Sequence, residues 1–173
     1  MSLPHPGTEP ADVLRSADGG ATWEGGGGFG DAPSRASWTF PVEPHQPHVL
    51  SIDLLPAAGA AGPAASGPAL AEGSWAGGVV AGVEVGGVLT SAGRGASWEE
   101  RSEGLYPDVH SCRIDPHDPA HWLAVTGGGL YASADAGASW RQLTGGMKRE
   151  RRCGGWGIWA AQLSAAVQVL QGR

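Results

Sequence analysis

A short motif that occurs three times restricts the folds open to this chain. The copies read "SADGGATW" from Ser16, "SAGRGASW" from Ser91 and "SADAGASW" from Ser133, so they start 75 and 42 residues apart. Apolar residues precede each copy and a tryptophan ends it. Such a turn-rich, regularly spaced pattern predicts several short strands joined by tight hairpins.

The residue types in the motif suit a hairpin. The aspartate can accept backbone N–H bonds within the turn, the glycine can adopt a positive φ, and the tryptophan offers a large face for packing. The second copy has Gly93 in place of the aspartate, and losing one such hydrogen bond costs about 1 kcal/mol, so we expect this hairpin to be the least firmly closed. The predicted structural positions are Ser16, Asp18, Gly20, Thr22, Trp23, Ser91, Gly95, Ser97, Trp98, Ser133, Asp135, Gly137, Ser139 and Trp140.

The longer interval is explained by two insertions. "HVLSIDLLP" from His48 and "HSCRIDPHDP" from His110 align as a strand that enters a proline turn, and "GVEVGGVL" aligns with "AVTGGGLY" ahead of the motif. The remaining excess falls at about 25–47 and at the Ala/Gly/Pro-rich stretch 57–76, both of which we expect to be surface loops. One interval of 42 residues is then one blade of a β-propeller.

The predicted fold class is all-β. Residues 1–147 are expected to form a partial β-propeller of about two to three blades, each an antiparallel four-stranded sheet. A propeller commonly needs four to eight blades, so the count predicts a truncated ring. The off-pattern tail 148–173 carries an apolar stripe that predicts a short C-terminal helix over 159–171. This tail either caps the last blade or is unrelated appended sequence.

The motif resembles the Asp-box, or bacterial neuraminidase repeat, and the wording around the second and third copies is similar to a bacterial branch labelled sialidase-like or glycosyl-hydrolase-like. The resemblance covers about 7–147. It implies that the box lies between the third and fourth strands of a blade, away from the channel where ligands bind. A sialidase of this kind also needs three substrate-binding arginines and an early Arg-Ile-Pro signature, and this sequence lacks that signature.

Two carboxylates are candidates for catalysis. Glu9 and Glu84 align at the same repeat position, with Thr126 third. Glycoside hydrolysis commonly uses two carboxyl groups about 5 to 10 Å apart, one of them held protonated. The alternative is that each glutamate accepts a hydrogen bond at a blade junction.

Candidate ligand-binding residues surround the aligned strand starts: His45, His48, Tyr106, Asp108 and His110. The aligned histidines could equally cap the strands, so no metal site and no cofactor are predicted. The stretch 114–122, "IDPHDPAHW", has the proline and aspartate pattern of a turn.

Charge and composition exclude some classes of function. A net charge of -6 gives no basic field for a nucleic acid. The sequence shows neither a signal peptide nor a membrane span, and two cysteines without a CxxC spacing fit the cytoplasm.

The leading hypothesis is a non-catalytic scaffold or ligand-binding module for a carbohydrate or protein, with self-association through open blade edges. The alternatives are an exo-sialidase-like glycoside hydrolase and a degenerate fragment without a function of its own.

Overall fold

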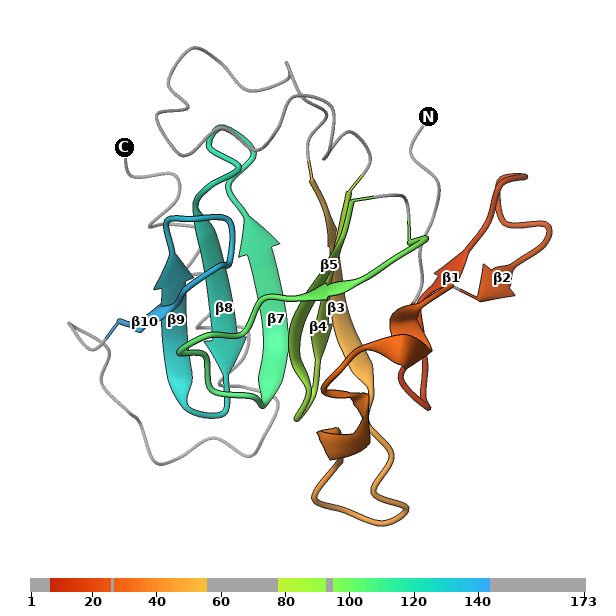
Figure 1. The fold of residues 1–173 in the computed structure, drawn as a ribbon, viewed down its shortest axis with the longest axis horizontal. Coiled ribbons are helices and arrows are strands. Elements are labelled where there is room, and N and C mark those ends of the chain that lie inside the picture. The colour runs from red at the N-terminus through yellow and green to blue at the C-terminus, as the bar shows by residue number, and fades with distance from the viewer. Residues whose placement is uncertain (1–6, 26, 56–77, 93–94, 144–173) are drawn as a thin grey trace, which may run out of the picture.

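Two four-stranded antiparallel sheets dominate the structure, a computed structural model that describes residues 7–25, 27–55, 78–92 and 95–143 (Figure 1). In each sheet every strand pairs with the next one along the chain, as in the blade of a propeller. One sheet holds β3 (Val49–Leu54), β4 (Val79–Val83), β5 (Gly87–Ser91) and β6 (Glu99–Glu100). The other holds β7 (Val109–Ile114), β8 (Trp122–Thr126), β9 (Gly129–Ser133) and β10 (Arg141–Gln142).

A third, smaller element precedes these sheets. It is the two-stranded pair of β1 (Leu14–Arg15) and β2 (Glu24–Gly25), extended by a bridge between Gly7 and Val13. The described residues contain no α-helix, only the 3-10 helices η1 (Phe29–Asp31) and η2 (Arg35–Ser37). The expected helix over 159–171, the tail 148–173 and the loop 57–76 lie outside the described residues.

The three motif copies occupy corresponding hairpins. The first joins β1 to β2, the second joins β5 to β6 and the third joins β9 to β10. In both complete sheets the motif therefore connects the third strand to the fourth, as the resemblance to the Asp-box implied.

The two sheets pack face to face near their first strands. Every residue of β4 and of β8 is buried, because both faces of these central strands are covered. One core cluster joins Val80 and Val88 of the first sheet to Val109 and Trp122 of the second. The seam between the sheets is thus a true hydrophobic interface.

Polar side chains of β3 complete the seam. β7 is an edge strand of its own sheet, so some of its amides have no strand partner. The Ser51 hydroxyl accepts a hydrogen bond from the Cys112 amide at 3.1 Å, and the Asp53 carboxylate accepts one from the Ile114 amide at 3.0 Å. Side chains two residues apart on one strand therefore satisfy alternate amides of the next.

The insertion at 25–47 supplies part of the core, although we expected a surface loop. Phe29 is fully buried, and its ring lies 5.3 Å from that of Trp38 and 4.8 Å from that of Trp98. Gly28 precedes η1 with a φ of 79°, which brings the backbone close to Ala96. Phe29 and Trp38 of this stretch cover the face of the first sheet that points away from the second sheet.

The strand register corrects the predicted alignment of His48 with His110. Val49 pairs with Val83, and Val109 pairs with Thr126, each just before a β-bulge. His48 therefore corresponds to Asp108, and His110 corresponds to Leu50. The identical letters in the two segments are offset by two residues from the register, because burial of the valines and not letter identity fixes how the strands pair.

Two backbone hydrogen bonds confirm the corrected equivalence. The Glu84 amide donates to the His48 carbonyl at 2.9 Å, and the Gly127 amide donates to the Asp108 carbonyl at 2.9 Å. Glu84 thus corresponds to Gly127 and not to Thr126. The turn that follows β8 is one residue shorter than the turn that follows β4, which hides the shift in the sequence.

Candidate functional site

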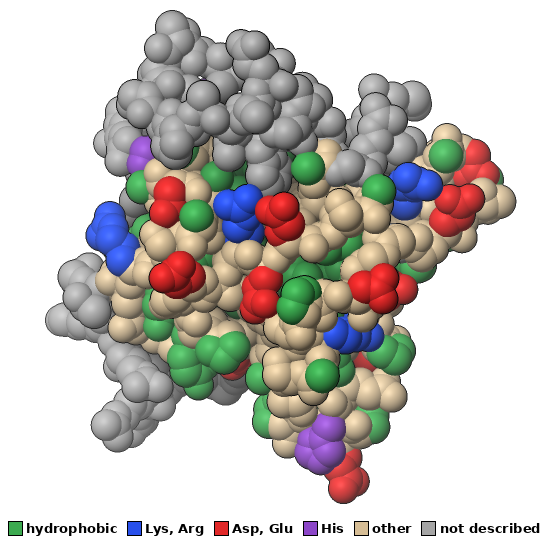
Figure 2. Space-filling model, in the orientation of Figure 1, with side chains coloured by type: hydrophobic (Ala, Val, Ile, Leu, Met, Phe, Trp, Pro, Cys, Tyr) green, Lys and Arg blue, Asp and Glu red, His purple; other side chains and the backbone are tan. Residues whose placement is uncertain are grey.

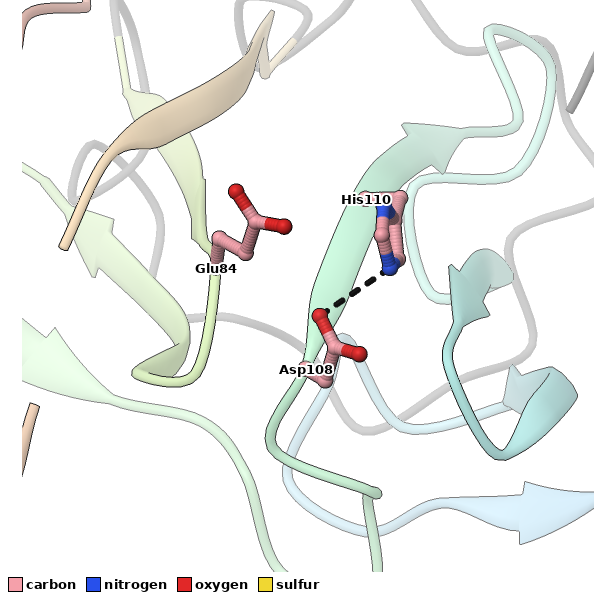
Figure 3. Close-up of side chains that lie close together, drawn as sticks. All are labelled: Glu84, Asp108 and His110. Carbon is pink, nitrogen blue, oxygen red and sulfur yellow. Dashed lines mark ion pairs between the residues drawn. The ribbon is translucent and has the colours of Figure 1, made fainter. Parts of the chain in front are cut away.

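A cluster of ionisable side chains lies at the end of the sheets opposite to the Asp-box-like hairpins. The turn 84–86 leads into β5, whereas the second motif copy follows the last residue of β5. Glu84 comes from this turn, and Asp108 and His110 come from the start of β7 in the other sheet (Figure 3). The cluster therefore straddles the seam.

Its three side chains are close enough to act together. One donor atom from each of Glu84, Asp108 and His110 lies within 4.8 Å of the other two. Nε2 of His110 lies 3.0 Å from Oδ1 of Asp108, an ion pair when the imidazole is protonated (Figure 3). This oxygen is buried and makes no hydrogen bond of good geometry with the described residues, so the contact is mainly electrostatic.

The surroundings of Glu84 change the pKa of its carboxyl group. Burial raises the pKa of Glu84, and the nearby Asp108 carboxylate adds to the rise, although His110 and His48 oppose it. A carboxyl group with a raised pKa beside a second carboxylate is a feature typical of functional sites, and also of structural ion-pair networks.

Glu9 lies at the neighbouring seam and pairs with a histidine. Its Oε2 is 3.2 Å from Nδ1 of His48, and its side chain is half exposed. The His48 ring packs edge-on against Phe40, and its Nε2 is buried without a hydrogen bond to the described residues. The structure thus places Glu9 beside His48, and Glu84 with Asp108 and His110.

The remaining predicted ligand residues fall in two places. Tyr106 is 47% exposed, and its ring lies directly against Gly128. Asp108 likewise lies against Gly127, so the turn 127–128 contacts both side chains. His45 lies apart, in the insertion, where its Nδ1 contacts the Phe40 carbonyl at 2.8 Å.

The polar groups of the first and third motif copies bond within their own hairpins. Asp135 accepts hydrogen bonds from the Ser133 hydroxyl at 2.7 Å and from the Ser139 amide and hydroxyl at 2.9 and 2.6 Å. The Ser133 hydroxyl also accepts the Gly137 amide at 2.8 Å. Corresponding bonds join Ser16, Asp18, Gly20 and Thr22 at 2.6 to 2.9 Å.

The motif carboxylates are acidified by these bonds. Hydrogen bonds from Thr22 and Ser16 lower the pKa of Asp18 to about 2. Burial raises the pKa of Asp135, but the bonds from Ser139 and Ser133 outweigh it and the net shift is downward. In the second copy the Ser91 hydroxyl accepts the Gly95 amide at 2.8 Å, the counterpart of the serine bonds above.

The tryptophans that end the motif copies have different surroundings. Trp23 is 42% exposed, whereas Trp98 and Trp140 are buried. Trp140 packs on Trp122 within its own sheet, and Trp98 packs on the insertion. Only the last two therefore act as core residues.

The approach of Asp108 to Glu84 is the feature that sequence reasoning missed. Asp108 and His110 were both candidates, but the sequence was aligned so that His110 matched His48. The short spacing Asp108-x-His110 at the beginning of β7 is a usable signal because it keeps an imidazole near a carboxylate, although the irregularity between Val109 and Ser111 interrupts the alternation of faces there.

Both signs of charge are mixed on one face of the described residues. Figure 2 shows acidic and basic side chains interspersed over one face, without a continuous basic area. No helix among the described residues has the length and apolar character needed to cross a membrane.

Comparisons with known proteins give two partial structural likenesses. The first is to the structure titled "YCF48 bound to D1 peptide", at 16% identity and a TM-score of 0.46, over 81% of this chain and 36% of that one. The second is to the GH74 xyloglucanase from Xanthomonas campestris, at 18% identity and a TM-score of 0.48, over 84% of this chain and 22% of that one. The chain thus spans about a third and a fifth of these proteins. No protein-family model matches it, and no curated protein matches it.

Proposed function

We propose that this chain is a non-catalytic binding module made of propeller blades, and that it binds a carbohydrate at the sheet ends that carry Glu84, Asp108 and Tyr106. The observation behind this proposal is the separation of two kinds of polar residue. Those of the motif copies bond within hairpins at one end of the sheets, whereas the ionisable cluster lies at the other end.

The chemistry of this end suits a sugar. Carboxylates accept hydrogen bonds from hydroxyl groups, and an exposed aromatic ring offers an apolar face with a polar tip. Tyr106 presents such a ring. Gly128 lies against the ring and has no side chain that could cover it. A few convergent polar groups beside an apolar surface are what small-molecule sites commonly contain.

Three of the described arginines argue against sialidase chemistry. Arg15 pairs with Glu24 and Arg101 with Glu99, each at 3.1 Å. Arg35 lies over the Trp38 ring and donates to the Ala11 carbonyl. These three guanidinium groups make their contacts at separate places, so they do not bind one substrate carboxylate together.

The test is a titration of the ¹⁵N-labelled full chain with sialyllactose and with a xyloglucan oligosaccharide, followed by NMR. We expect amide shift changes at 84–86, 106–110 and 127–128 with one of these probes, without sugar product. Shift changes confined to the motif hairpins, or no response to either probe, would contradict the proposal. Release of product would overturn its non-catalytic part.

A second candidate function is glycoside hydrolysis, and one observation favours it. Glu84 has a raised pKa and lies beside Asp108, as an acid and its partner carboxylate do in such enzymes. This pair is an alternative to the predicted pair of Glu9 and Glu84, which stays a prediction. Hydrolysis of aryl glycosides that is abolished in Glu84→Gln and retained in Glu9→Gln would establish it.

The third candidate is a degenerate fragment. A soluble chain that unfolds in one cooperative transition would count against it.

The outermost strands β6 and β10 are two residues long, and we retain the proposal that the chain self-associates through open sheet edges. Light scattering that shows only monomer would refute this.

A further inference from the structure

We propose that Glu84, Asp108 and His110 form a binding site for a divalent transition-metal ion, with Zn²⁺ as the representative ion. The inference does not depend on carbohydrate binding. It rests on the donor atoms, their spacing and the burial of one carboxylate oxygen.

The spacing of the donors is close to that of a coordinated set. Zinc lies about 2.0 to 2.2 Å from nitrogen and carboxylate ligands, so two ligands of one ion are about 3 to 3.5 Å apart and at most about 4.3 Å apart. Nε2 of His110 and Oδ1 of Asp108 already lie 3.0 Å apart. All three donors lie within 4.8 Å of one another, close to the largest separation that one ion allows.

The charge balance of the cluster also favours a cation. Two carboxylates share a half-buried site with one imidazole, and the buried Oδ1 of Asp108 has the ion-pair contact with His110 at 3.0 Å but no hydrogen bond of good geometry among the described residues. A buried carboxylate oxygen normally has a donor or a metal as its partner. A bound dication would satisfy this oxygen and remove the repulsion between Glu84 and Asp108.

The backbone holds the three donors in place. The turn that carries Glu84 is anchored by its own amide to the His48 carbonyl. The start of β7 is anchored by the bond between the Asp108 carbonyl and the Gly127 amide, and the absence of a side chain at Gly127 leaves room for the Asp108 carboxylate. Ligands fixed by two sheets are positioned before the ion arrives.

The donor types select the class of ion. One imidazole nitrogen and two carboxylate oxygens suit zinc and other first-row transition metals, whereas magnesium and calcium prefer oxygen ligands alone. Three protein ligands leave a coordination position open to water or to a ligand.

The alternative is a purely structural ion pair, and the chain contains a matched example. Nδ1 of His121 lies 2.6 Å from Oδ2 of Asp118 in the turn between β7 and β8. Among the described residues no third donor completes a metal-binding group there. His121→Gln is therefore the control for loss of a histidine from a His–Asp pair.

The experiment is calorimetric titration of the untagged, EDTA-treated full chain with ZnCl₂ and, separately, with MgCl₂. We expect one Zn²⁺ per chain, no comparable Mg²⁺ binding, and at least about a tenfold loss of affinity in Glu84→Gln and in His110→Gln, with His121→Gln unchanged. Circular dichroism shows that each variant is folded. If a variant does not fold, NMR of the wild-type chain decides: Zn²⁺ should shift the His110 ring nitrogens more than those of His121. No saturable binding, equal affinity for Mg²⁺, equal losses in the control, or equal ring shifts would each overturn the site.

Discussion

The indole nitrogen of Trp140 donates a 2.8 Å hydrogen bond to the carbonyl of Arg101. Trp140 ends the third motif copy in the second sheet, and Arg101 directly follows β6 of the first sheet. The Trp140 amide also donates to the Glu103 carbonyl at 2.9 Å. The third motif hairpin, in the second sheet, is therefore hydrogen-bonded to the segment that follows β6 of the first sheet.

The first prediction compares this tryptophan with Trp98. Both are buried and end a motif copy, but Nε1 of Trp98 has no hydrogen-bond partner among the described residues. Replacing either with phenylalanine removes similar volume, while only Trp140→Phe loses an indole hydrogen bond. Urea unfolding should show Trp140→Phe to be less stable than Trp98→Phe by about 1 kcal/mol. Equal losses would mean that the Arg101 bond contributes nothing.

The second prediction concerns the seam. Ser51→Ala removes the acceptor of the Cys112 amide, which is buried between the sheets. Leaving that amide unsatisfied should cost about 1 to 3 kcal/mol and speed its hydrogen exchange. Ser111→Ala is the control, because the Ser111 hydroxyl makes no hydrogen bond with the described residues. An unchanged hydrogen-exchange rate at the Cys112 amide would show that the Ser51 hydroxyl does not protect this amide.

The third prediction uses the raised pKa of Glu84, which burial causes first and Asp108 second. The folded chain then holds this proton more tightly than the unfolded chain, so stability falls as the pH rises from the usual glutamate pKa through the raised one. Glu84→Gln should therefore raise the melting temperature at pH 7.5, and the gain should shrink toward pH 4. A gain that is the same at both pH values would contradict this account.

The fourth prediction uses the lowered pKa of Asp135, where the bonds from Ser139 and Ser133 outweigh burial. This contribution to stability is present above the usual aspartate pKa and is lost as the pH falls through the lowered value. Asp135→Asn should destabilise the chain at pH 7, by less as the solution becomes acidic. A loss of stability in Asp135→Asn that stays equally large in acid would contradict this account.

The repeat made the sheets and hairpins predictable because its turn chemistry is local. Asp135, for example, bonds only to residues within four positions of itself. The alignment of His48 with His110 failed because the buried valines Val49 and Val109, and not the shared letters, set the register, and because the turns that follow β4 and β8 differ in length. These are properties of pairing between strands, which a single sequence does not record.

The candidate site was predictable in its members and not in its grouping. Glu84, Asp108 and His110 were each singled out, but which of them meet depends on the seam between two sheets. The contribution of the insertion to the core was missed for a similar reason. Phe29 lies among glycines, and nothing in its neighbours shows that Trp38 and Trp98 enclose it.

The bonds from Ser51 and Asp53 to the next strand have an evolutionary consequence. They join consecutive sheets by a hydroxyl and a carboxylate and not by a shared backbone ladder. A gene segment encoding one repeat carries its half of this joint with it. The second sheet repeats only part of this joint, because Ser111 on β7 stands at the position that corresponds to Ser51, whereas Arg113 stands at that of Asp53. A further repeat docked on β7 would therefore find the hydroxyl acceptor but not the carboxylate.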